Sequence, residues 1–188
     1  MRTLIALATL AFAAGASAEA LDYQIDKVHS QVHASVLHMG FSNSTARFNV
    51  KEGSIRFDAT DVASAKVDAT LNVAGISLGD ATWQEHVSAD KWFNVAAFPE
   101  ARFVSTKVEK TGDKTMTVSG DLTLKGVTLP VTLQATLNQA GPHPMSKKPA
   151  LGISANGSIK RSDFGISEYL GPVSDEVQIR IELEASAG

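Results

Sequence analysis

The sequence predicts an all-β protein, an antiparallel barrel or sandwich of about eight short strands with one short helical insertion. Two observations lead to this fold class. Apolar and polar residues alternate with a period of two over several segments, which is typical of strands that cover a core on one side. No long amphipathic helix separates these segments, so parallel βαβ units are not expected. The 188 residues, 44% hydrophobic and 20% charged, fit one folded domain and exclude intrinsic disorder.

The first 18 residues are typical of a secretory signal peptide. Arg2 precedes an apolar run, Leu4–Ala14, and Ala16 and Ala18 form a small-x-small cleavage site before Glu19. The run is shorter than the roughly 20 apolar residues of a membrane-spanning helix. The chain has no cysteine, so a lipid anchor after the cleavage site is excluded. We expect residues 1–18 to be removed and residues 19–188 to form a single domain in the bacterial periplasm.

The strands are predicted from alternation and from the turns between them. Ser30–His38 comes first, with Val32, Ala34 and Val36 at every second position. Val67–Val73 and Glu176–Glu184 show the same alternation. Enrichment in Thr and Val and turn pairs such as Lys125-Gly126 mark the remaining strands. These are expected at Gly53–Asp58, Ala101–Glu109, Thr115–Lys125, Thr128–Asn138 and Leu151–Lys160.

One segment, Asp80–Ala97, departs from the strand pattern. Asp80 and Ser88 are suitable helix N-caps, and Pro99 ends any helix that precedes it. We therefore predict two short helices here. The segment and its border hold four of the twelve aromatic residues of the chain, and these either plug one end of a barrel or serve as ordinary packing: Trp83, Trp92, Phe93 and Phe98.

Composition and motifs exclude most catalytic chemistry. The net charge of −3 offers no basic excess for nucleic acid, and the absence of cysteine removes thiolate metal sites and cysteine nucleophiles. Neither a Gly-x-Ser-x-Gly elbow nor a phosphate-binding glycine-rich loop occurs. His29 and His33 lie on one face of the predicted strand but about 13 Å apart, too far to share an ion. We therefore predict no catalytic residue, no metal and no cofactor.

Three stretches together resemble a known family. The chain resembles the YceI-like family of exported polyisoprenoid-binding proteins from about Leu21 to Glu184. It departs from the usual family pattern at two places. The segment Trp83–Val87 stands where Arg-Asp-x-His-Leu is common, and it keeps only the histidine, His86. Ala34 stands where Phe is common. The stretches are Tyr23-x-Ile25-Asp26-x-x-His29-Ser30 with Val32–Gly40, Gly120–Val131, and Arg161–Gly165 with Ser174–Val177.

The resemblance implies a lipocalin-like, eight-stranded antiparallel barrel that encloses one long isoprenoid chain and has no catalytic activity. The ligand is expected to be a prenyl quinone or a polyprenyl phosphate, held by a periplasmic carrier or sequestering protein. Two other classes remain open: an enzyme acting on such lipids, and a packed envelope barrel without a ligand. Assembly as a homodimer is also left open.

The expected ligand-binding residues are the inward positions of the strands, the insertion aromatics and a few groups at the mouth. His38 is expected either to bind a ligand headgroup or to satisfy buried backbone groups. Phe164 either contacts the ligand or closes a corner of the barrel. Arg161 and Asp163 either gate the mouth or form an ion pair that anchors a turn, and we expect the ion pair. The full set is Val32, Ala34, Val36, His38, Leu71, Trp92, Phe93, Phe98, Leu122, Leu124, Phe164 and Ile179.

Overall fold

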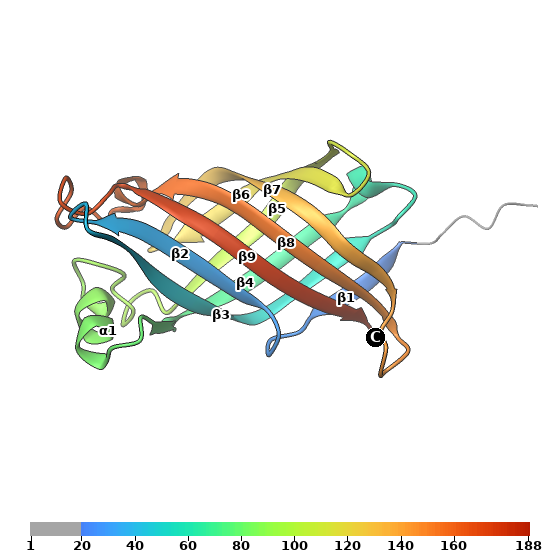
Figure 1. Ribbon diagram of the computed structural model, residues 1–188, viewed down its shortest axis with the longest axis horizontal. Helices are drawn as coiled ribbons and strands as arrows, with labels where there is room; N and C mark the ends of the chain where they lie inside the picture. Colours follow the sequence, from blue (N-terminus) through green and yellow to red (C-terminus); the bar gives the residue numbers. More distant parts are fainter. Residues whose placement is uncertain (1–19) are drawn as a thin grey trace, which may run out of the picture.

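The computed structural model describes residues 20–188, so the predicted signal peptide lies outside the described residues. Nine strands, one α-helix and two 3₁₀ turns form this part of the chain (Figure 1). The strands are β1 (Leu21–Ile25), β2 (Gln31–His38), β3 (Ser42–Phe57), β4 (Lys66–Ser77), β5 (Glu100–Lys110), β6 (Thr115–Leu124), β7 (Val127–Pro142), β8 (Pro149–Lys160) and β9 (Glu176–Ala187). The other elements are η1 (Val62–Ser64), α1 (Ala81–Ser88) and η2 (Arg161–Phe164).

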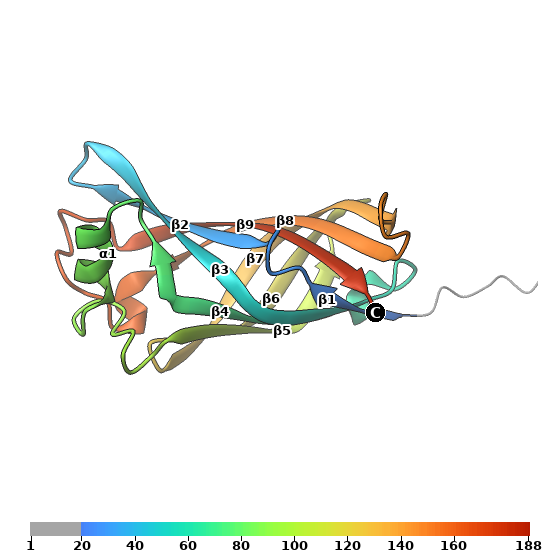
Figure 2. The ribbon, with the colours of Figure 1, turned by 90° about the horizontal axis from the view of Figure 1, so that it is seen from below.

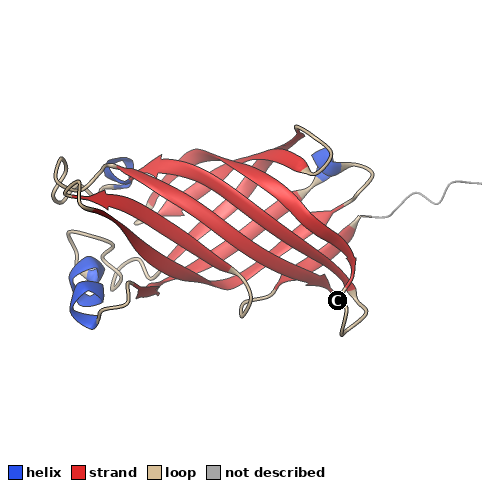
Figure 3. Cartoon of the chain, in the orientation of Figure 1, coloured by secondary structure: helices blue, strands red, loops and turns tan. Residues whose placement is uncertain are grey.

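The strands close into an antiparallel barrel with eight strand positions, which confirms the predicted fold class (Figure 3). Successive strands from β2 to β9 pair with one another, and β9 pairs back onto β2. β1 and β2 run in the same direction and share the eighth position, because both pair with β3 on one side and β9 on the other. Closure leaves no free sheet edge along the barrel wall.

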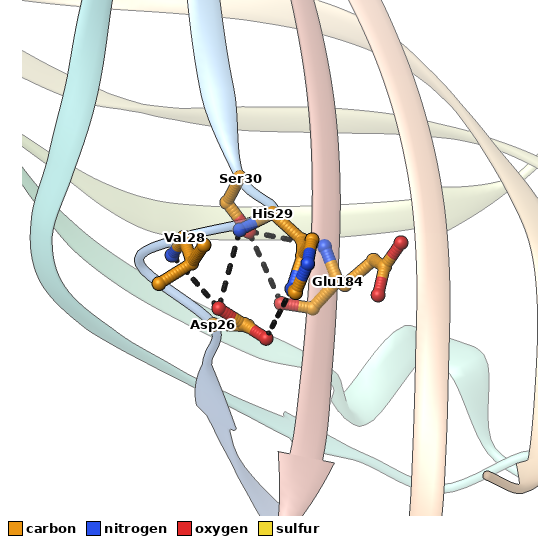
Figure 4. A network of polar contacts seen from close by, with 5 residues as sticks. All are labelled: Asp26, Val28, His29, Ser30 and Glu184. Atoms are coloured by element: carbon orange, nitrogen blue, oxygen red, sulfur yellow. Dashed lines mark hydrogen bonds and ion pairs between the residues drawn. The ribbon is translucent and has the colours of Figure 1, made fainter. Parts of the chain in front are cut away.

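The break between β1 and β2 is stabilised by the backbone amide of Asp26 and the side chain of Ser30 (Figure 4). β9 continues past the break, where the main chain of Glu184 needs partners. The Asp26 amide donates to the Glu184 carbonyl at 2.9 Å, and the Glu184 amide donates to Ser30 Oγ at 3.1 Å. Strand β1 was missing from the sequence prediction, because five residues are too few to show a clear alternation.

The insertion contains one α-helix, so the prediction of a second helix was wrong. Asp80 caps α1 as expected, and its carboxylate accepts a hydrogen bond from the Trp83 amide at 2.9 Å. The chain then leaves the helix at Ala89, which is extended, and continues through turns to Phe98. Asn94 has a positive φ of 49° there, a left-handed conformation that interrupts any helix.

The two ends of the barrel are covered by different segments. The chain terminus at Ala187–Gly188 and η1 lie at one end, called the C-terminal end, and α1 lies at the other, called the α1 end (Figures 1 and 3). The loop 143–148 joins β7 to β8 at the C-terminal end. None of the helices in residues 20–188 has the length and hydropathy required to span a bilayer.

Candidate ligand-binding lumen

An apolar cavity of about 220 Å³ lies inside the barrel, and we call it the lumen. This volume is the space in which the centre of a water-sized sphere can move, and about 10–15 Å³ of it suffices for one water. On β4, Val67, Ala69 and Leu71 line the lumen, while the intervening Asp68 pairs with Arg102 on the outer wall. The alternation read from the sequence therefore corresponds to lumen and solvent faces.

Small side chains leave this space unfilled. Six alanines line the lumen, and five of them lie on five different strands: Ala34 on β2, Ala69 on β4, Ala101 on β5, Ala135 on β7 and Ala155 on β8. An eight-stranded barrel is just wide enough to be filled by side chains or to hold a small ligand. With alanine at these inward positions, this barrel retains room for a ligand.

The C-terminal end of the lumen is closed by tightly packed side chains. Tyr23, Ile55, Phe57 and Met116 are only 2–7% exposed, and they belong to one buried cluster. They come from the regular strands β1, β3 and β6. Closure at this end therefore comes mainly from the hydrogen-bonded sheet, and Ala65, which follows η1, completes the same cluster.

The α1 end is closed by residues outside the strands. Phe93, from the turns after α1, lines the lumen and packs edge-on against Phe48 with ring centroids 5.7 Å apart. Ile166, from the loop after η2, also lines it and is 2% exposed. Segments without regular secondary structure open locally more easily than barrel strands.

Arg161 alone has a polar side chain among the described residues that line the lumen. It is 4% exposed, and its guanidinium donates to the carbonyls of Ser174, Ile166, Glu168 and Val173 at 2.8–3.0 Å. Burial lowers the pKa of this guanidinium. Trp92 covers one face, with its ring centroid 5.6 Å from Arg161 Cζ. Arg161 thus fixes the loop 165–174 over the α1 end.

The expected ion pair between Arg161 and Asp163 is not formed, because backbone carbonyls surround the guanidinium. The carboxylate that anchors this turn is Asp175 instead. It accepts hydrogen bonds from the Ser162 amide at 2.9 Å and from Ser162 Oγ at 2.7 Å. These hydrogen bonds, the amide bond first, lower the pKa of Asp175.

Seven of the sequence-predicted site residues line the lumen, and together they come from four strands and the α1 end. They are Val32, Ala34, Leu71, Phe93, Leu122, Leu124 and Ile179. Sequence reasoning missed Phe48 and Val50, which also line the lumen from β3. Their alternation with Arg47 and Asn49 was the signal, but the predicted strand began only at Gly53.

The other five predicted residues do not line the lumen. Val36 and His38 follow Ser35, where pairing of β2 with β9 ends, so they belong to a β2–β3 hairpin that extends past the barrel. Trp92 lies behind Arg161, and Phe98 packs against the β6–β7 turn, where a Cβ on Gly126 would come within 2.8 Å of its ring. Phe164 is 2% exposed within η2 and packs outside the cavity.

A polar cluster lies on the outer wall, at the break between β1 and β2 (Figure 4). His29 Nδ1 is 2.8 Å from Asp26 Oδ2, and this hydrogen bond lowers the pKa of Asp26 and raises the pKa of His29. Ligand atoms of Asp26, His29 and Glu184 lie within 4.8 Å of one another. The Asp26 carboxylate also accepts from the Val28 amide at 2.8 Å. These bonds give the cluster a structural role in the turn.

Comparison with known proteins agrees with this architecture. The model of the YceI-like domain matches residues 23–185. The chain is 41% identical to Protein YceI of Escherichia coli O157:H7 over 182 residues, which cover 96% of this chain and 94% of that protein. The crystal structure of Burkholderia cenocepacia BcnA is 28% identical, with a TM-score of 0.76 over 86% of this chain and 99% of BcnA.

A more distant solved structure shares the fold. It is a polyisoprenoid-binding domain from Saccharophagus degradans, implicated in plant cell wall breakdown. It is 17% identical to this chain, with a TM-score of 0.67 over 89% of this chain and 99% of that domain.

Proposed function

The chain belongs to the YceI-like family, and from that premise we propose that it binds one long isoprenoid lipid inside the barrel and holds it without chemical change. The observation that carries the proposal is the lumen wall. Its described lining side chains are apolar apart from Arg161. Such a wall offers nothing to a sugar, a nucleotide or a peptide, whereas it suits a hydrocarbon chain.

The isoprenoid nature of the ligand is supported by the fold it shares with a polyisoprenoid-binding domain. Burial of one methylene contributes about 0.8 kcal/mol, so a chain of some dozens of carbons nominally gains more than the limit of about −18 to −21 kcal/mol seen for non-covalent binding. The entropy lost by ordering the chain offsets much of this gain. We therefore expect high affinity and weak discrimination between chains of similar length.

We propose that the headgroup lies at the α1 end, near Arg161, and that the tail extends toward Phe57 and Met116. A quinone carbonyl and a phosphate oxygen both accept hydrogen bonds, so both headgroup classes predicted from the sequence fit a cationic neighbour. Arg161 has no carboxylate within ion-pair distance among the described residues, which favours an electron-rich head.

We place the protein in the periplasm as an isoprenoid carrier or sequestering protein. The proposal is supported by the signal-peptide pattern of residues 1–18. The mature protein is expected to begin at Glu19 and to be found in the soluble envelope fraction. N-terminal sequencing of protein from that fraction tests this, and protein that still begins at Met1 contradicts it.

Mass spectrometry of organic extracts tests the binding proposal. Mature protein purified from its host is extracted, and lipid is quantified against protein; about one prenyl lipid per chain is expected. Delipidated protein is then incubated with a prenyl quinone or a polyprenyl phosphate and analysed by native mass spectrometry. Protein that carries no lipid and takes up neither compound would instead be a packed barrel without a ligand.

A further inference from the structure

Exposed apolar side chains gather at the α1 end of the barrel. They come from three segments: the turn between β2 and β3, helix α1, and the loop 165–174. We call this set the rim patch, and Phe41 is its most exposed member at 91%. The patch consists of Leu37, Met39, Phe41, Trp83, Tyr169 and Leu170.

The three segments form one continuous surface. The Met39 amide donates to the Pro172 carbonyl at 2.7 Å, and the Ser174 amide donates to the Leu37 carbonyl at 3.0 Å. These bonds attach the β2–β3 turn to the loop 165–174. The His38 and Trp83 rings, with centroids 6.4 Å apart, bring α1 alongside the same turn. The rim patch is therefore contiguous, and one of its segments, the loop 165–174, also closes the lumen.

The tip of the patch is uncharged and projects from the molecule. No Asp, Glu, Lys or Arg occurs between Lys27 and Arg47, a stretch that includes the whole β2–β3 hairpin turn. Figure 2 shows this hairpin extending beyond the barrel wall on the side of α1. A projecting, uncharged tip with an aromatic side chain can insert into a lipid bilayer, whose hydrocarbon lies below a layer of polar headgroups.

We propose that the rim patch docks on the surface of a lipid bilayer and presents the α1 end of the lumen to the membrane. The inference rests on the proposed function, because an isoprenoid ligand resides in a bilayer before it is bound. Trp and Tyr prefer the headgroup region, and Phe and Leu prefer the adjoining hydrocarbon. Ion pairing contributes little to this docking, since the chain as a whole is acidic, with a net charge of −3.

Flotation with vesicles tests the proposal. Mature protein is mixed with phosphatidylcholine vesicles that contain no isoprenoid, and the floated fraction gives a partition coefficient. Phe41→Ser is expected to lower this coefficient about tenfold or more, since it removes the most exposed apolar side chain of the patch. Met145→Ser is the matched control, because Met145 is 87% exposed but lies in the loop 143–148 at the C-terminal end. It is expected to leave partitioning unchanged.

Trp83 provides a direct optical readout. The chain has two tryptophans, so the Trp92→Phe variant reports on Trp83 alone, and its emission is expected to shift to the blue with vesicles. Replacing part of the phosphatidylcholine by phosphatidylglycerol is expected to leave binding nearly unchanged or to weaken it, and raising salt is expected not to weaken it. Binding that appears only with phosphatidylglycerol overturns the proposal.

Three further results would also overturn it: the wild type fails to float, Phe41→Ser and Met145→Ser float to the same extent, or sedimentation without vesicles shows a dimer that Phe41→Ser dissociates. Such a dimer would mean that a second copy of this chain covers the patch. The vesicles contain no isoprenoid, so this test fails or succeeds independently of lipid extraction.

Discussion

The two ends of the barrel are closed by different means. At the C-terminal end, side chains that come mainly from regular strands pack into one buried cluster that includes Ile55 and Phe57. At the α1 end, closure depends on Phe93 and on the loop 165–174, which Arg161 holds through carbonyl hydrogen bonds. The exposed apolar rim patch lies only at the α1 end. From this difference we propose that one end maintains the fold and that the other admits the ligand.

A pair of Phe→Ala substitutions tests this division most strongly. Phe57→Ala is expected to lower the free energy of unfolding by about 3–5 kcal/mol, since it removes a buried aromatic side chain from the C-terminal end. Phe93→Ala is expected to cost clearly less, because Phe93 is only partly buried whereas Phe57 is 6% exposed. Urea unfolding of the two ligand-free variants gives both values. Equal costs would mean that both ends contribute alike to stability.

Arg161→Lys sharpens the comparison at the α1 end. A lysine ammonium cannot reproduce the guanidinium geometry that serves four carbonyls, so at least one buried carbonyl loses its partner. The expected cost is about 1–3 kcal/mol. Hydrogen exchange is expected to rise in residues 165–174 and to remain unchanged in β1 and β6. Arg180→Lys on the outer wall, where Arg180 is 73% exposed, is the matched control and is expected to have little effect. Faster exchange throughout the barrel would contradict a local clamp.

The smallest effect is expected for Asp26→Asn, at the turn near the C-terminal end. The pKa of Asp26 lies below its ordinary value of 3.8, so the carboxylate stabilises the fold above about pH 4, and this contribution is lost as pH falls through the folded pKa. The pKa of His29 lies above its ordinary value of 6.5, so the imidazolium stabilises the fold below about pH 6.5, and this contribution is lost as pH rises through the folded pKa.

The stability difference between wild type and Asp26→Asn is therefore expected to be largest between about pH 4 and 6.5. Both side chains are exposed, so the difference should be small and should shrink with salt. Melting temperatures from pH 3 to 8 measure it, with His29→Gln and the double variant completing a cycle. A difference that does not vary with pH would show that the turn depends on geometry alone.

The strand interiors could be predicted from sequence, whereas the ends of the barrel could not. Alternation placed Ala34 and Leu71 on the inward face, because a regular strand turns every second side chain to one side. The same rule failed at Val36, since β2 leaves the barrel after Ser35 and no local pattern marks that point. The partners of Arg161 could not be predicted, because the four backbone carbonyls that accept its hydrogen bonds belong to a loop that tertiary packing brings over it.

Substitution of Ala34 by Trp tests the central claim, that the lumen is the binding compartment. Ala34 lines the lumen on β2. Ala74 on β4 is exposed, so Ala74→Trp makes the same change in side-chain volume outside the lumen and serves as the control. Titration of delipidated protein with a prenyl quinone is expected to show that Ala34→Trp has lost binding with little change in stability, while Ala74→Trp binds as the wild type does. Unchanged binding by Ala34→Trp, or a loss of stability of about 1–3 kcal/mol as expected for an overpacked core, would contradict a ligand-sized lumen.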